Sequence, residues 1–143
     1  EEQIDNEKYE VKVRDWDDAG KYGIAELLTS LNRIRREHVE AFSYHNVSIL
    51  PSSDPNIIAF ARHTPAELTS TGKPETLIVV VNLDGHNAHQ SLIHLELPDL
   101  DIDPKHDVQV RDELTGHEFT WGWDNFVSLA PWADVAHVFH IVR

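Results

Sequence analysis

Eight short segments rich in β-branched and aromatic residues follow Phe42, and they constrain the fold more than any other feature of the sequence. Turn-forming residues separate them, and no helical pattern lies between them. The segments are HNVSIL (45–50), NIIAFARH (56–63), TLIVVVNL (76–83), SLIHLELP (91–98), DVQVRDEL (107–114), HEFTW (117–121), NFVSLAP (125–131) and AHVFHIV (136–142). Such strands pair with their neighbours without crossover helices, so the pattern predicts an antiparallel β-sandwich or barrel.

Two of these segments allow a finer prediction. In the segment 76–83, Leu77 and Val79 point to one face while Ile78 and Val80 point to the other. A strand that is apolar on both faces is buried on both faces, so this segment is predicted to be a central strand. The run DELTGHEF predicts a hairpin that turns at Thr115–Gly116.

The segment before the strands has a different period. Apolar residues recur at helical spacing from residue 24 to about residue 41, which predicts one amphipathic helix. Its apolar stripe comprises Ile24, Leu27, Leu28, Leu31, Ile34 and Phe42, and its polar face comprises Glu26, Ser30, Arg33 and Glu37. Because the stripe is broad, we expect the helix to pack against a large surface. Residues 1–22 show no such period and are expected to be irregular or partly extended.

The composition excludes several classes of partner. The formal net charge is −13, which opposes binding to phosphate backbones and to anionic membranes, so neither nucleic acid nor a membrane is an expected partner. There are no cysteines, so disulfides and thiolate zinc sites are excluded, and a cytoplasmic location is expected. No membrane-spanning run and no signal peptide are visible. The sequence has no Met and begins with Glu1, which predicts a fragment of a longer protein.

The ten histidines do not predict a metal site. His137 and His140 are three apart on a predicted strand, so they face opposite sides and cannot share one ion. His86 and His89 flank a turn and could meet, but the sequence places no third ligand beside them. The turn histidines are therefore expected to be solvated, and neither a metal nor a cofactor is predicted.

Two tryptophans leave two interpretations open. Trp121 and Trp123 flank Gly122, and exposed aromatic rings can stack on the apolar face of a sugar. The alternative is that one ring packs into the sandwich while the other covers its edge. We favour the second interpretation.

Charged clusters give no complete catalytic set. Asp112, Glu113 and Glu118 surround the predicted hairpin, and carboxylates on an exposed hairpin are usually solvated. No phosphate-binding Gly-rich loop, nucleophile elbow or HExxH motif is present.

The arginines of the predicted helix are expected to be structural. They are Arg33, Arg35 and Arg36, which lie late in the helix, where cations favour the helix dipole. We expect them to pair with Glu37, Glu40 and nearby acids of the sheet rather than to bind phosphate.

Three stretches together resemble a known family. They are DNEKYEVKVRDWD (5–17), LLTSLNRIRREH (27–38) and the run from VVVNLDGHNAH through VRDELTGHEFTWGWDNFVSLAP to AHVFHIV (79–142). In this order and spacing they are similar to the C-terminal part of bacterial α-1,4-glucan:maltose-1-phosphate maltosyltransferases of the α-amylase superfamily, glycoside hydrolase family 13. The sequence departs from the family pattern at Val39, where Pro is common, and at Phe60, where Tyr is common.

The resemblance implies a division of the chain. Residues 1–44 would be a remnant of a catalytic (β/α)₈ barrel, comprising a rim loop and the last barrel helix, and residues 45–143 would form the all-β C-terminal sandwich domain. The catalytic carboxylates of the superfamily lie on earlier barrel strands, so the chain would contain no catalytic residue and would be inactive alone. The intact enzyme would transfer maltosyl from maltose 1-phosphate to the non-reducing end of an α-glucan, with retention through two displacements.

The resemblance also implies binding residues and partners. Lys8 and Tyr9, and more weakly Asp5, would donate or accept hydrogen bonds to sugar hydroxyls from the rim; the alternative is that Tyr9 packs under the loop and Lys8 is solvated. The implied partners are the α-glucan, maltose 1-phosphate, the chain's own catalytic barrel and, in the full-length protein, a second copy in a homodimer. Two other interpretations stay open: another enzyme of the α-amylase superfamily, or a free-standing carbohydrate-binding module with Trp121 and Trp123 as its platform.

Overall fold

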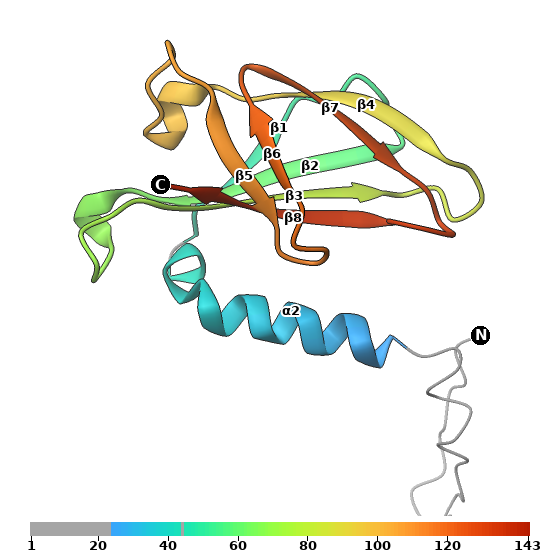
Figure 1. Cartoon of the computed structure of the whole chain (residues 1–143), viewed down its shortest axis with the longest axis horizontal. Coiled ribbons are helices and arrows are strands. Elements are labelled where there is room, and N and C mark those ends of the chain that lie inside the picture. Colours follow the sequence, from blue (N-terminus) through green and yellow to red (C-terminus); the bar gives the residue numbers. More distant parts are fainter. Residues whose placement is uncertain (1–23, 44) are drawn as a thin grey trace, which may run out of the picture.

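The computed structural model describes residues 24–43 and 45–143, which form one α-helix, eight strands and three short 3₁₀ turns (Figure 1). The helix is α2 (Ala25–Glu37), and the 3₁₀ turns are η1 (Val39–Phe42), η2 (Ala66–Leu68) and η3 (Leu97–Leu100). The strands are β1 (Val47–Leu50), β2 (Ile57–Thr64), β3 (Glu75–Asn82), β4 (His89–His94), β5 (Val108–Asp112), β6 (Glu118–Trp121), β7 (Asp124–Leu129) and β8 (Ala136–Val142). Each of the eight predicted segments overlaps one strand, with bounds that differ by a few residues.

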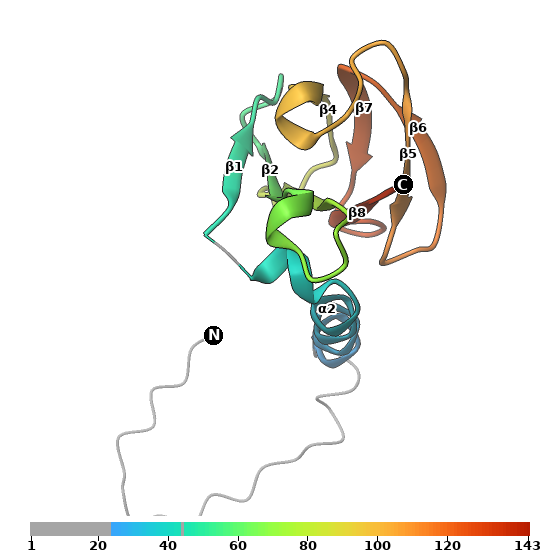
Figure 2. The same ribbon diagram turned by 90° about the vertical axis from the view of Figure 1, so that its left-hand side faces the viewer.

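The strands form two antiparallel sheets, as the sequence predicts. The larger sheet has the order β1-β2-β3-β8-β5-β6, and the smaller sheet pairs β4 with β7. Helix α2 lies against the face of the larger sheet that points away from β4 and β7, so the layers are helix, six-stranded sheet and two-stranded sheet (Figure 2). The expectation of a mainly β sandwich preceded by one helix is confirmed.

The main core lies between the two sheets. Its buried side chains include Leu50, Ile57, Ala59, Ala61, Ile78, Val80, Ile93, Leu95, Leu97, Leu100, Val110, Trp121, Val127, Leu129, Phe139 and Ile141. Strand β3 is central in the larger sheet, between β2 and β8, and contributes to both of its faces. Ile78 and Val80 enter the main core while Leu77 and Val79 face the helix, as the alternation predicts.

A second, smaller core joins α2 and η1 to the larger sheet. Ile34, Ala41, Leu77 and Val138 are buried there, with Val79 and Leu114 packed around them. The remaining apolar side chains of the helix are much less covered.

The predicted helix ends earlier than expected. Its α-helical part stops at Glu37, and a 3₁₀ turn continues the chain to Phe42. No Gly or Pro marks the break; it falls at His38, whose backbone leaves the helical region (φ −113°, ψ 43°) and whose ring is held by the sheet. A tertiary contact therefore ends the helix, which periodicity alone does not predict.

The predicted hairpin is confirmed, since β5 and β6 pair across a turn in which Gly116 has φ +81°. A side chain at that position would be strained, so the glycine is required there. In the described residues, no helix has both the length and the apolar composition needed to cross a membrane.

Candidate functional site

The residues predicted to bind sugar lie outside the described part of the chain. They are Asp5, Lys8 and Tyr9, so the structure does not test their role. Other candidate sites are built below from the described residues.

The two candidate sugar-stacking tryptophans do not form a shared platform. Trp121 is 4% exposed and its ring lies 4.5 Å from that of Phe139, inside the main core. Trp123 is 38% exposed, and its ring lies 6.0 Å from that of His94. The interpretation in which one ring packs inside and the other lies at the surface is confirmed, and a platform that includes Trp121 is excluded.

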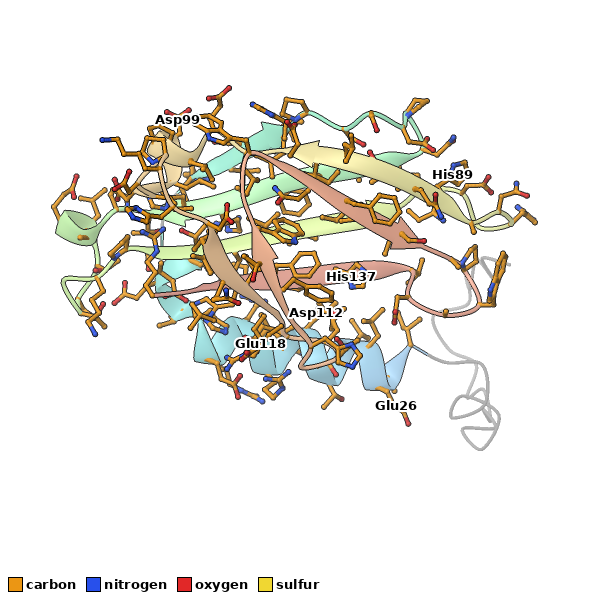
Figure 3. The ribbon with its side chains drawn as sticks, turned by 45° about the horizontal axis from the view of Figure 1, so that its top comes forward. Glu26, His89, Asp99, Asp112, Glu118 and His137 are labelled. Carbon is orange, nitrogen blue, oxygen red and sulfur yellow. The ribbon has the colours of Figure 1, made fainter. Side chains whose placement is uncertain are left out.

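Asp112 is buried, and the expectation that it is solvated is wrong. One oxygen accepts hydrogen bonds from the backbone N–H groups of Leu114 (3.2 Å) and Val138 (3.1 Å), and the other accepts from Thr115 (2.9 Å) and contacts Nδ1 of His137 (2.9 Å) (Figure 3). Burial by itself raises the pKa of Asp112, but the bonds from His137, Thr115 and the backbone outweigh it and lower the pKa. Asp112 therefore fastens the β5–β6 hairpin to β8.

Glu113 is also buried, again contrary to expectation, whereas Glu118 is exposed as predicted. Arg111 donates two hydrogen bonds to Oε1 of Glu113, from Nε (2.9 Å) and Nη2 (2.8 Å). Arg33 donates to the Glu113 carbonyl oxygen (2.6 Å) and pairs with Glu37 (2.5 Å).

The predicted pairing of Arg33 with Glu37 is confirmed, and Arg33 also lies 3.7 Å from Oε2 of Glu113. Glu40, the other acid expected to pair with the helix arginines, accepts hydrogen bonds from Ser70 instead. The contacts of Arg33 tie α2 to the hairpin.

Two histidines and a third acid meet where α2 ends. Nδ1 of His38 lies 2.6 Å and Nε2 of His140 lies 3.2 Å from the same oxygen of Glu75. Burial raises the pKa of Glu75, but the hydrogen bonds from His140 and His38 outweigh it and lower the pKa to about 2. The sequence did not predict this cluster, because His38 lies at the end of α2, Glu75 at the start of β3 and His140 on β8. No local motif joins them.

His89 bridges two aspartates. The prediction that it is a solvated turn residue is therefore wrong. Its Nδ1 lies 2.8 Å from Asp54 and its Nε2 lies 3.0 Å from Asp84. These hydrogen bonds, above all the one that His89 donates to Asp84, raise the pKa of His89, and the same contacts help to lower the pKa values of both aspartates. The prediction of a solvated side chain holds for His86, which is exposed.

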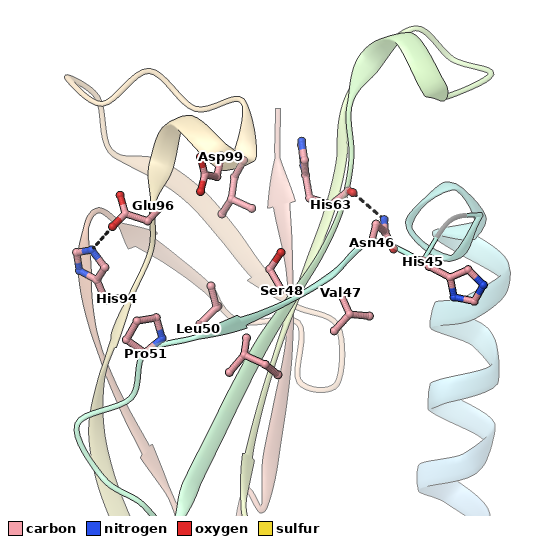
Figure 4. Close-up of a pocket in the computed structure, with 12 residues that line it drawn as sticks. His45, Asn46, Val47, Ser48, Leu50, Pro51, His63, His94, Glu96 and Asp99 are labelled. Atoms are coloured by element: carbon pink, nitrogen blue, oxygen red, sulfur yellow. Dashed lines mark hydrogen bonds and ion pairs between the residues drawn. The ribbon is translucent and has the colours of Figure 1, made fainter.

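A cavity of about 290 Å³ opens beside β1 and η3 (Figure 4). His94 pairs with Glu96 (3.2 Å) at one end, His45 lies at the other end, and Ser48 and His63 lie between them. The cavity therefore does not gather its titratable groups around one point, as acid–base catalysis would need.

An apolar surface runs along the first part of α2. Ile24, Leu27, Leu28 and Leu31, which we call the apolar stripe, are between 36% and 65% exposed in the described part of the chain, whereas Ile34 is 2% exposed. Beside the stripe is an almost wholly apolar cavity of about 340 Å³, lined by Leu31, Phe42, Phe60 and neighbouring side chains. We expected the apolar face of the helix to pack against a large surface, but only the part from Ile34 onwards does so.

The fold is a mainly β, antiparallel sandwich preceded by one helix, whose apolar stripe is exposed in the described part of the chain. Comparison with known proteins gives the family: the chain matches "GLGE, C-terminal" over residues 49–141 and belongs to it.

Curated relatives agree with this assignment. The chain is 72% identical to an α-1,4-glucan:maltose-1-phosphate maltosyltransferase of Bifidobacterium longum and 59% identical to one of Bifidobacterium animalis subsp. lactis. In both cases 99% of the chain is aligned, with 19% of the relative. It is 39% identical to maltosyltransferase 2 of Streptomyces coelicolor over its whole length. The chain thus spans about a fifth of the length of these relatives.

Proposed function

We propose that the chain is part of an α-1,4-glucan:maltose-1-phosphate maltosyltransferase, which transfers maltosyl units from maltose 1-phosphate to the non-reducing end of α-1,4-glucans. The observation that carries the proposal is the 72% identity over 99% of the chain to a relative of that name. The reaction places the intact protein in cytoplasmic α-glucan synthesis, with no cofactor required.

Residues 45–143 act as the C-terminal sandwich domain, and residues 1–44 belong to the catalytic barrel. The apolar stripe of α2 supports this division, because its four apolar side chains are exposed here and would be buried by a further packing partner. The relatives are about five times longer than the chain, so most of the protein that could cover the stripe lies outside it. We assign the stripe to contacts with the rest of the barrel, and leave a second copy of the protein as the alternative partner.

The catalytic carboxylates lie in the part of the protein outside this chain. Retaining glycosyl transfer uses two carboxyl groups about 5–5.5 Å apart on either side of the scissile bond. The buried acids of the described residues are occupied otherwise: Asp112 binds His137 and backbone N–H groups, and Glu113 binds two arginines. The chain contributes sugar contacts instead, from Lys8, Tyr9 and Asp5 on the rim of the site.

Phosphate release from maltose 1-phosphate, with maltoheptaose as acceptor, tests the proposal. The longer protein that contains this chain should release phosphate and lengthen the acceptor by two glucose units. The isolated 143-residue chain, folded as judged by circular dichroism, should release none above a blank without protein. Release by the isolated chain that is abolished by changing one of its acids would overturn the assignment of catalysis to the missing part.

A further inference from the structure

The strongest unexplained feature is the cluster of His38, Glu75, Glu113 and His140. One oxygen of Glu75 lies 2.6 Å from Nδ1 of His38 and 3.2 Å from Nε2 of His140, so it can accept the ring N–H of both histidines. One carboxylate therefore fixes the tautomer of two imidazoles. This is the arrangement in which a second carboxylate orients metal-binding histidines.

The other nitrogen of each ring has no partner. Nε2 of His38 and Nδ1 of His140 are buried and lack a hydrogen-bond partner in the described residues. Each carries a lone pair when the ring proton is held by Glu75, and burying such an acceptor without a donor costs free energy.

A third group completes the set. The Glu113 side chain is 5% exposed, and its Oε1 lies 3.6 Å from Nε2 of His38. One ligand atom each of His38, His140 and Glu113 lie within 4.8 Å of one another. Its Oε1 is held by Arg111, while Oε2 has only Arg33 nearby, at 3.7 Å. Because Arg111 and Arg33 offset the charge of Glu113, binding here would rest on ligand type and position rather than on a strong negative field.

We propose that His38, His140 and Glu113 bind one Zn²⁺ ion, with Glu75 as the positioning residue of both histidines. Zinc takes imidazole and carboxylate ligands at about 2.0–2.2 Å in a tetrahedron, in which ligand atoms lie about 3.3 Å apart. The ligand atoms now lie within 4.8 Å of one another, so zinc binding would draw them closer together. Calcium and magnesium are disfavoured because they select oxygen ligands.

The site would join separate elements of the fold. His38 ends α2, Glu113 follows β5, and His140 lies on β8, so a bound ion would fasten the helix to the six-stranded sheet. His140 and Glu75 also line an open cavity of about 460 Å³, so one side of the cluster lies next to solvent.

Zinc titration of the chelator-treated 143-residue chain tests the proposal. In competition with a chromophoric chelator near neutral pH, we expect one Zn²⁺ per chain with a Kd of about 1 µM or tighter. Saturating zinc should raise the thermal midpoint, and Co²⁺ should give the visible absorption of a four-coordinate nitrogen–oxygen site. The absence of saturable one-to-one binding would overturn the proposal.

Variants separate this site from adventitious binding by other histidines. His38→Gln and His140→Gln should weaken zinc binding at least about 100-fold, and Glu75→Gln by about 10- to 100-fold. His86→Gln, which changes an exposed histidine, should leave binding unchanged. Equal losses in His86→Gln and His140→Gln would contradict the site. If a ligand variant does not fold, the Co²⁺ spectrum of the unmodified chain decides, since a six-coordinate spectrum contradicts the proposed ligands.

Discussion

Asp112 is a single carboxylate that connects two elements through four contacts. Replacing it by Ala leaves the N–H of Val138 and the ring of His137 without their acceptor in a buried position. We therefore expect Asp112→Ala to lower the free energy of unfolding by about 3 kcal/mol, measured by urea denaturation. The matched control is Glu118→Ala on the same hairpin, where the exposed side chain should change stability by less than about 0.5 kcal/mol. Equal effects of the two variants would show that the hydrogen bonds of Asp112 do not stabilise the fold.

His89 should make stability depend on pH. Its pKa is raised in the folded chain by Asp84 and Asp54, so protonated His89 stabilises the fold below its unfolded pKa of about 6.5. This contribution is lost as the pH rises through the higher folded pKa. The lowered pKa values of Asp54 and Asp84 act at the other end, where stability is lost as the pH falls below about 4 and these groups become protonated.

The thermal midpoints of the unmodified chain and of His89→Gln, measured between about pH 5 and pH 9, check this prediction. The midpoints should differ most near pH 5–6 and should converge at high pH. His117→Gln, at an exposed histidine, should show a constant difference from the unmodified chain. A difference for His89→Gln that grows with pH would have the wrong sign.

At the scale of elements, α2 should behave as two halves. Ile34 is 2% exposed and packs on Leu77 and Val138, so Ile34→Ala should cost about 2–4 kcal/mol of unfolding free energy. Leu28 is 48% exposed, so Leu28→Ala should cost less than about 1 kcal/mol in this chain. Urea denaturation of both variants gives the comparison. Equal costs would mean that the apolar stripe is already covered within the 143 residues.

The positions of the strands along the sequence were predictable, but which strands pair with one another was not. Alternation and turn residues are local signals, which is why all eight strands and the Gly116 turn were found. The insertion of β8 between β3 and β5 and the separate pairing of β4 with β7 depend on contacts distant in sequence. The same limit explains the errors at Asp112 and Glu113, whose burial comes from β8 and α2 rather than from the hairpin's own sequence.

At the scale of the molecule, the described residues form a buried core between the two sheets and leave one apolar surface, the stripe of α2, exposed. The main core between the sheets includes none of the described residues of α2, whereas the smaller core depends on Ile34 and Ala41. This asymmetry is what the proposed division predicts, since a sandwich domain keeps its own core and a barrel helix shares its packing with the rest of the barrel.

We propose that the chain belongs to a maltosyltransferase and that Lys8 contacts its sugar substrate. The most direct test is the kcat/KM of the longer protein for maltose 1-phosphate, compared between the unmodified enzyme, Lys8→Ala and Lys105→Ala. A charge-assisted hydrogen bond to a sugar oxygen contributes about 1.5–3 kcal/mol, so Lys8→Ala should lower kcat/KM about ten- to a hundredfold. Lys105, exposed in a loop of the sandwich, should be neutral when replaced. An unmodified enzyme that releases no phosphate from maltose 1-phosphate, or a Lys8→Ala enzyme with unchanged kcat/KM, would contradict the account.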